Sequence, residues 1–148
     1  MGSFLSYKKI ASLDVGLKRI GVSVHIKGIT LPKPAILRKN RKQASAEVDA
    51  FLSQNQIDIL IVGCPENKDN PASLDMIKRI EFFVSLLSFS GAVYYMDESF
   101  SSREAGESIQ GVIKHKKDGK IDSLAAKIIL DRWLEKYPTL NGDNDYHP

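Results

Sequence analysis

Residues 12–22 read "SLDVGLKRIGV" and place one carboxylate and a turn between two apolar runs. The runs on either side of Gly16 are rich in β-branched and apolar residues, so we expect strands at 8–15 and 20–26. Strands this close in sequence pair as an antiparallel hairpin. The stretch therefore predicts the first two strands of a sheet, joined by a tight turn.

Asp14 is the carboxylate in this stretch, and its environment is unusual. The period of a strand puts it on the same face as Ile10 and Ser12. A charge in a central strand needs a cation, hydrogen bonds or water, and ligands of open α/β sheets gather at the carboxyl ends of strands. Aspartate is also common in turns, so the stretch alone leaves open whether Asp14 only caps the turn at Gly16.

The rest of the chain alternates between helical and strand patterns. It predicts an edge strand with two prolines at 29–37, a helix at 43–55, a strand buried on both faces at 57–63, a helix beginning at Asn70 and Pro71, a strand at 92–97, a helix opening at 101–104 and a last helix at 121–136. We expect an α/β fold with a mixed five-stranded sheet, the first strands antiparallel, the later strands parallel, and helices on both faces. Residues 1–138 would form one domain and 139–148 a tail.

The last helix is expected to bury one apolar face. The helical spacing of its apolar residues predicts that five side chains point inward: Leu124, Ala125, Ile128, Ile129 and Leu134.

Charge and cysteine content limit the class of protein. The net charge is +3, and cations cluster at 38–42 and 114–120. Such runs suit a polyanion but are as typical of solvated loops. A single cysteine, Cys64, excludes an internal disulfide, and residues 1–10 lack the apolar core of an export signal. We expect a cytoplasmic protein without a membrane partner.

Two further acidic segments, one with two carboxylates and one with a single carboxylate, accompany Asp14. Asp97 and Glu98 end a predicted strand, and Asp122 begins the last helix, on the face of its small and apolar neighbours. Carboxylates are hard ligands that suit Mg²⁺ or Mn²⁺, whereas the single cysteine and the dispersed histidines show no metal-ligand spacing. A carboxylate in a first helical turn also interacts favourably with the helix dipole, so Asp122 alone has a structural explanation.

Four segments together resemble one family. They read "LDVGLKRIGV", "IVGCPENKDN", "DESFSSREA" and "KIDSLAAKIIL", and they span residues 13–130. The chain resembles the YqgF family, also called RuvX-type Holliday junction resolvases or pre-16S rRNA nucleases. The resemblance implies a ribonuclease H-like fold and metal-dependent cleavage of a nucleic acid, with catalytic and metal-binding carboxylates at Asp14, Glu98 and Asp122.

The resemblance also assigns the cations. Lys18 and Arg19 match the family's K-R pair and could hold a phosphate near the metal. The family's D-E-R segment reads Asp97-Glu98-Ser99 here, so its arginine is absent, and we hypothesise that Arg103 substitutes for it. Further phosphate contacts are expected from loop cations at Lys114, Lys116 and Lys117.

The working hypothesis is hydrolysis assisted by two Mg²⁺ or Mn²⁺ ions, with Asp14 bridging them. The alternative is a nucleic-acid-binding module of ribosome assembly or transcription with little hydrolysis. An actin-like ATPase is excluded because 148 residues leave no room for a second phosphate loop and a second domain. The sequence does not choose between pre-16S rRNA and a branched DNA junction, or between a monomer and a homodimer.

Overall fold

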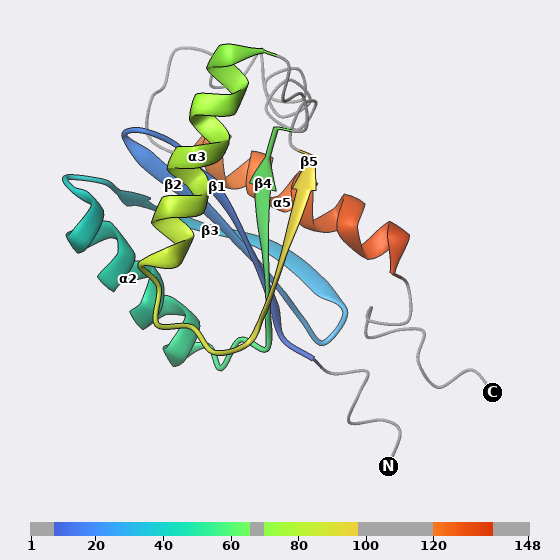
Figure 1. Ribbon diagram of the computed structural model, residues 1–148. Coiled ribbons are helices and arrows are strands. Elements are labelled where there is room, and N and C mark those ends of the chain that lie inside the picture. Colours follow the sequence, from blue (N-terminus) through green and yellow to red (C-terminus); the bar gives the residue numbers. More distant parts are fainter. Residues whose placement is uncertain (1–7, 66–69, 98–119, 138–148) are drawn as a thin grey trace.

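The strands form one mixed sheet in the order β3-β2-β1-β4-β5 (Figure 1). The computed structural model describes residues 8–65, 70–97 and 120–137, without the side chains of 120–122. The elements are β1 (Ile10–Val15), β2 (Arg19–Ile26), β3 (Ile29–Leu37), α2 (Arg41–Gln54), β4 (Ile59–Cys64), α3 (Pro71–Ser85), β5 (Ala92–Asp97) and α5 (Lys120–Lys136). The predicted helix at 101–104 lies outside the described residues.

The pairing directions are those predicted from the sequence. β1 and β2 pair antiparallel, with Leu13 opposite Val22, and β2 pairs antiparallel with β3. β4 and β5 run parallel to β1, which the helices α2 and α3 make possible by carrying the chain back between strands. β1 and β4 are buried along their whole length, as expected for central strands.

β3 is an edge strand, as its prolines predict. Pro32 and Pro34 lack a backbone N–H and therefore suit an edge, where one side of the strand is unpaired. The next helix begins at Arg41, two residues before the predicted start. The reason is a capping box, in which Asn40 accepts from the backbone N–H of Gln43 and Gln43 reaches back to the backbone N–H of Asn40.

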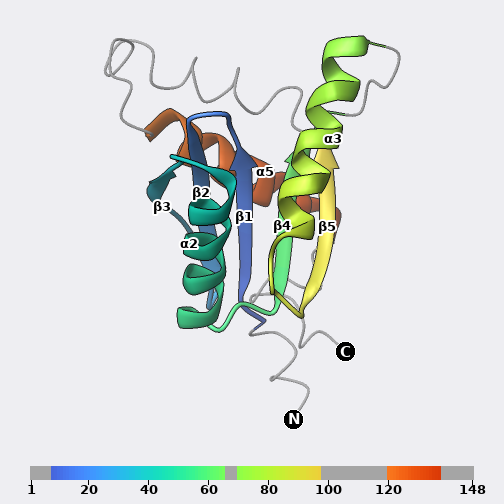
Figure 2. The same ribbon diagram turned by 60° about the vertical axis from the view of Figure 1, so that its left-hand side comes forward.

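Helices cover both faces of the sheet (Figure 2). α2 and α3 pack on one face over a core that includes Leu13, Val22, Leu60 and Phe83. α5 packs alone among the described helices on the other face, over a smaller core. Alternate residues of β1 belong to the two cores, so each side chain of this strand is assigned to one face.

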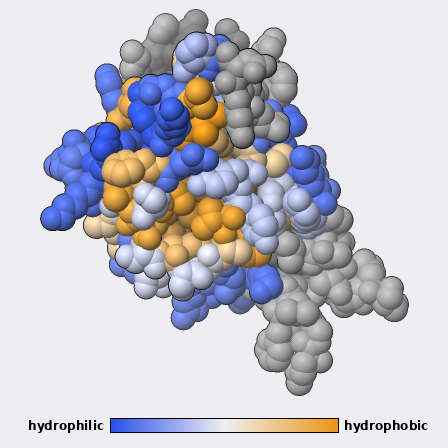
Figure 3. Space-filling view, in the orientation of Figure 1, coloured by the Kyte–Doolittle hydropathy of each residue, from blue (hydrophilic) through white to orange (hydrophobic). Residues whose placement is uncertain are grey.

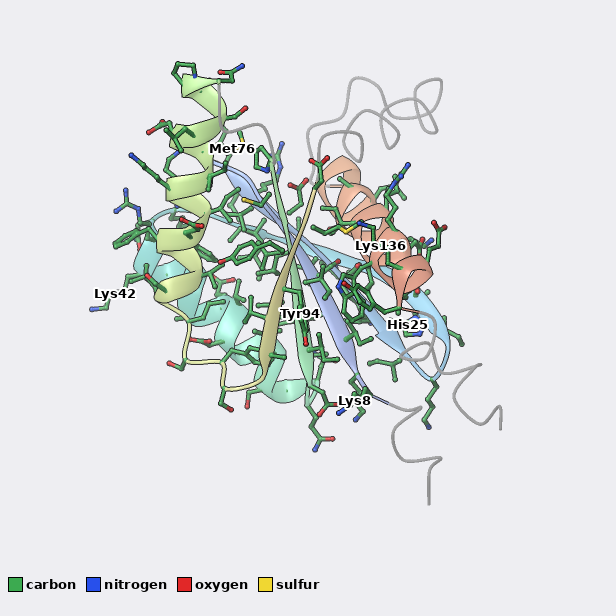
Figure 4. The ribbon with its side chains drawn as sticks, turned by 45° about the vertical axis from the view of Figure 1, so that its right-hand side comes forward. Lys8, His25, Lys42, Met76, Tyr94 and Lys136 are labelled. Carbon is green, nitrogen blue, oxygen red and sulfur yellow. The ribbon has the colours of Figure 1, made fainter. Side chains whose placement is uncertain are left out.

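The buried face of α5 differs in part from the predicted one. Leu124 and Ile128 are only half-buried, so their prediction as core residues was wrong. Ala126, Leu130 and Trp133 are buried instead. The helix crosses the sheet, and Trp133 reaches the ring of Tyr94 on β5, with ring centroids 5.6 Å apart. Tyr94 lies on the side of β5 toward α5 (Figure 4).

Among the described helices, none combines the length and the apolar character that a membrane span requires.

Two adjacent phenylalanines of α3 test this layering. Phe83 is fully buried, whereas Phe82 is 47% exposed. Phe83→Ala should lower the free energy of unfolding by about 3–5 kcal/mol, because it leaves a cavity under α3. Phe82→Ala should change it by about 0.5 kcal/mol or less. Urea unfolding followed by circular dichroism measures both, and equal losses would contradict the assignment of the two faces.

Candidate active site

Asp14 lies near the carboxyl end of β1, the middle strand of the sheet, and is only 8% exposed. It alternates with Leu13 and Val15, which belong to the core under α2 and α3. Asp14 therefore lies on the α5 face. Ser12, two residues earlier on the same face, fixes this side to α5, because its hydroxyl donates to the carbonyl oxygen of Ala126 at 2.6 Å.

Glycines lie on both sides of Asp14 in the sheet. Gly21 on β2 pairs with Asp14 directly. On β4, Val62 pairs with Leu13, so the next residue, Gly63, continues the register beside Asp14. Neither neighbour has a side chain that could cover the carboxylate. Sequence reasoning missed both residues, although a glycine inside a strand is a signal for close approach by a ligand or another backbone.

The turn after Asp14 is tight, as predicted. The backbone N–H of Gly16 donates to the carbonyl oxygen of Arg19 at 3.0 Å. A Cβ at Gly16 would lie 2.6 Å from that oxygen, so a larger residue would force the turn to move. Arg38 holds the turn from outside, since its Nη1 donates to the carbonyl oxygen of Gly16 at 2.8 Å. The sequence had singled out Arg38 only as one cation of a basic run.

The two predicted phosphate-binding cations differ in position. Lys18 is exposed on the turn, and its carbonyl oxygen accepts from the backbone N–H of Arg38 at 2.8 Å. Arg19 is half-buried at the start of β2. Because Ile20 belongs to the core under α2 and α3, alternation places Arg19 on the face of Asp14. Both cations thus lie close in the chain to the carboxylate, and Arg19 shares its face.

Serine contacts fix the beginning of α5 over β1, β2 and β3. Ser123 donates to the carbonyl oxygen of Lys33 at 2.6 Å and accepts from the backbone N–H of Val22 at 3.3 Å. Since the Ser12 hydroxyl donates its proton to Ala126, the hydroxyl of Ser23, 2.5 Å away, must donate to Ser12. These contacts place the first turn of α5, whose backbone includes residue 122, at the sheet beside Leu13 and Val22.

Asp97 lies on the opposite face from Asp14. Together with Cys64 and with Glu81 of α3, it lines a surface hollow of about 400 Å³. In the same hollow, burial, followed by the charge of Glu81 and the effect of Cys64, raises the pKa of Tyr95. Asp97 is therefore not placed to share a metal ion with Asp14, which leaves Glu98 as the candidate from this segment.

Several predicted site residues cannot be placed. Glu98, Arg103, Lys114, Lys116 and Lys117 lie outside the described residues, as does the side chain of Asp122. Among the side chains that are described, no group of three or more His, Cys, Asp and Glu could hold a metal ion. Asp14 is thus the one predicted metal ligand with a described side chain. Its oxygen donors and its glycine neighbours fit a hard divalent cation.

The comparison with protein families decides the relationship. The model of the RuvX family, described as Holliday junction resolvase, matches residues 8–136. The chain belongs to the RuvX family. Its relatives include a protein of Sulfurovum sp. (strain NBC37-1), 54% identical over 127 residues, which cover 85% of this chain and 98% of the relative. A protein of Campylobacter lari is 46% identical over 123 residues, which cover 82% of this chain and 94% of the relative. Both are provisionally named pre-16S rRNA nucleases.

Solved structures support the ribonuclease H-like fold of this RuvX-family chain. RuvC of T. thermophilus in complex with a Holliday junction substrate has a TM-score of 0.55 at 13% identity, covering 90% of this chain and 98% of RuvC. The Fowlpox virus resolvase with Holliday junction DNA also has a TM-score of 0.55, at 16% identity. The match covers 87% of this chain and 98% of the resolvase. At this identity the likeness concerns the fold alone.

The serine contacts under α5 can be tested by stability. Ser12→Ala should lower the free energy of unfolding by about 1–3 kcal/mol, because it leaves the buried Ser23 hydroxyl without its acceptor. Ser12→Ala combined with Ser23→Ala should recover part of this loss, since both partners are then removed.

Ser45→Ala is the matched control, because this buried serine donates only to Lys42 in its own helix. Its effect should be about 0.5 kcal/mol or less. A loss for Ser12→Ala no larger than that of Ser45→Ala would show that the contact does not hold α5.

Proposed function

We propose that this RuvX-family chain is a metal-dependent nuclease that hydrolyses phosphodiester bonds, with Asp14 as the central metal ligand. The observation that carries the proposal is the position of Asp14. A nearly buried carboxylate lies at the carboxyl end of the middle strand, with glycine on both neighbouring strands. The carboxyl ends of strands are where open α/β sheets bind their ligands.

The metal is proposed to be Mg²⁺ or Mn²⁺, held as two ions by Asp14, Glu98 and Asp122. Bound divalent ions supply two effects in such a site: they lower the pKa of a water molecule and they neutralise charge on the leaving oxygen. Ionised carboxylates would hold the ions through their oxygen atoms, which are the ligands that Mg²⁺ prefers. Asp122 belongs to the first turn of α5, and Ala125 and Ala126 in the next turn are fully buried.

The chain's own cations would bind and orient the substrate. Arg19, on the Asp14 face, is proposed to donate to phosphate oxygens near the scissile bond, and Lys18 to a more exposed phosphate. Gly16 and Arg38 would keep the turn that carries Lys18 in one position relative to Asp14. Arg103, Lys114, Lys116 and Lys117 are proposed to contact phosphates farther along the strand.

The substrate that we propose is an RNA, at the 5′ end of the precursor of 16S rRNA. The relatives at 46–54% identity, aligned over almost their whole length, carry the name of that activity. The structures with junction DNA share only 13–16% of their residues with this chain. Cleavage of a Holliday junction is the second candidate, supported by the description of the family.

Replacing Asp14 tests the proposed chemistry. Asp14→Asn keeps the shape of the side chain but removes a negative charge, so Mg²⁺-dependent cleavage should fall by several orders of magnitude with the fold intact. Asp97→Asn, on the opposite face, is the matched control and should keep activity within a few-fold. Cleavage of the RNA precursor and of a four-way junction with Mg²⁺ and with Mn²⁺ is the measurement.

Three outcomes have distinct meanings. Undiminished cleavage by freshly purified Asp14→Asn would contradict the proposed site. Wild-type protein that binds RNA without cleaving either substrate would favour the nucleic-acid-binding module. Cleavage of the junction alone would assign the DNA substrate.

Gly63 tests the space beside Asp14. Gly63→Val adds a side chain on the Asp14 face of β4, and its β-branched shape suits a strand. The Mg²⁺ concentration for half-maximal cleavage should rise about tenfold or more, and Gly63→Ala should give a smaller rise in the same direction. If both variants show the same Mg²⁺ dependence as the wild type, the metal does not bind in the space beside Gly63.

A further inference from the structure

Three arginines converge on the side of the sheet away from the proposed metal site. Arg38 directly follows β3, Arg41 begins α2, and Arg79 lies on α3. The guanidinium of Arg38 lies over the ring of Phe83, 5.2 Å from its centroid. That of Arg41 lies over the ring of Phe82 at 4.9 Å. We refer to Arg38, Arg41 and Arg79 as the arginine cluster.

Within the described residues, the positive charge of the cluster is incompletely neutralised. Burial lowers the pKa of Arg38, and the charges of Arg41 and Arg79 lower it further. Among the described residues, no carboxylate pairs with Arg38 or Arg41, and Asp75 meets Arg79 only at 3.6 Å between exposed side chains. α2 begins here without an acidic residue in its first turn, so the positive end of its dipole adds to the potential.

The surface around the cluster is hollowed and is lined mainly by polar and basic residues. Leu17, Arg38, Lys39, Asn40 and Arg41 line a surface hollow of about 430 Å³. In the space-filling view, hydrophilic side chains gather at the left-hand edge over the beginning of α2 (Figure 3). Lys42 points outward from the same region (Figure 4).

The cluster lies on the opposite face of the sheet from Asp14 but beside the same β1–β2 turn. Leu37, the last residue of β3, pairs with Arg19, the first residue of β2, so α2 begins beside the turn that follows Asp14. Arg38 connects the two sites, because it contacts the carbonyl oxygen of Gly16 and also packs on α3. Arg38 alone is enough to hold the Gly16 turn. This role does not explain why two further positive charges, Arg41 and Arg79, lie where they repel Arg38.

We propose that Arg41 and Arg79, with Lys39 and Lys42, bind backbone phosphates of the RNA outside the scissile bond, and that Arg38 positions the Gly16 turn between this surface and Asp14. This inference rests on the proposed nuclease function for the choice of RNA. The exposed guanidinium of Arg41, supported on the ring of Phe82, suits a phosphate contact of this kind. Such contacts add affinity without reading sequence.

The test compares two double variants with equal loss of charge. Arg41→Gln with Arg79→Gln removes the proposed contacts. Lys27→Gln with Lys136→Gln removes charges from the turn at the other end of β2 and from the end of α5. Both are made in full-length Asp14→Asn protein, so that RNA binding is measured without cleavage. The probe is a labelled stem–loop RNA with a single-stranded 5′ extension, titrated over a range of KCl concentrations.

The arginine variant should bind the RNA about tenfold more weakly at 0.1 M salt, and its slope of log affinity against log salt should be shallower by roughly 1 to 2. The lysine variant should stay within about twofold of its parent, since counterion release requires a phosphate contact at that position. In the active background, the arginine variant should raise KM and leave kcat unchanged.

Unchanged affinity and slope in the arginine variant would overturn the proposal, as would an equal loss in the lysine variant. Binding is read without cleavage, so this result is separate from a failure of the nuclease proposal, which would appear as a wild-type protein that cleaves neither RNA nor junction DNA. Thermal unfolding of each variant ensures that a loss of binding reflects the surface.

Discussion

Burying a carboxylate in the middle strand of a sheet costs free energy unless polar groups or cations contact it. Asp14 is such a carboxylate, and the arrangement of the residues around it depends on this requirement. Glycines lie beside it on both neighbouring strands, so neither neighbour's side chain covers the carboxylate, and the turn at Gly16 brings Lys18 and Arg19 close to it in the chain. An apolar neighbour on β2 or β4 would instead have covered the carboxylate. The proposed chemistry follows from this position of Asp14 at the carboxyl end of the middle strand.

The two faces of the sheet have different tasks. On one face, Ser12, Ser23 and Ser123 fix the beginning of α5 to β1, β2 and β3 through hydroxyl groups. The later turns of this helix pack over the smaller apolar core, which includes Ile129, Leu130 and Trp133. On the other face, Phe83 and its neighbours form the larger core under α2 and α3. The larger core and the proposed chemistry thus lie on opposite faces of β1, and Arg38 connects the face of the larger core to the Gly16 turn.

Sequence patterns predicted the sheet, because strand periodicity and the prolines of β3 are local signals. They indicated that β4 is buried on both faces, since its apolar run lacks polar alternation, and they placed Asp14 near the carboxyl end of a central strand. They could not show that Asp97 faces away from Asp14, which depends on the register between β4 and β5. The inward face of α5 was missed at Leu124 and Ile128 because the angle at which a helix crosses a sheet is set by tertiary contacts. The hydrogen bond of Arg38 to Gly16 joins residues 22 positions apart, and no local pattern encodes it.

The most direct test is to locate the metal. Crystals of the protein soaked in Mn²⁺ would be measured with X-rays at the manganese absorption edge, and the anomalous map would show where the ions bind. The account predicts peaks at the Asp14 carboxylate, on the α5 face between Gly21 and Gly63, and their loss in Asp14→Asn. Peaks in the hollow lined by Asp97 and Glu81, with none at Asp14, would contradict it.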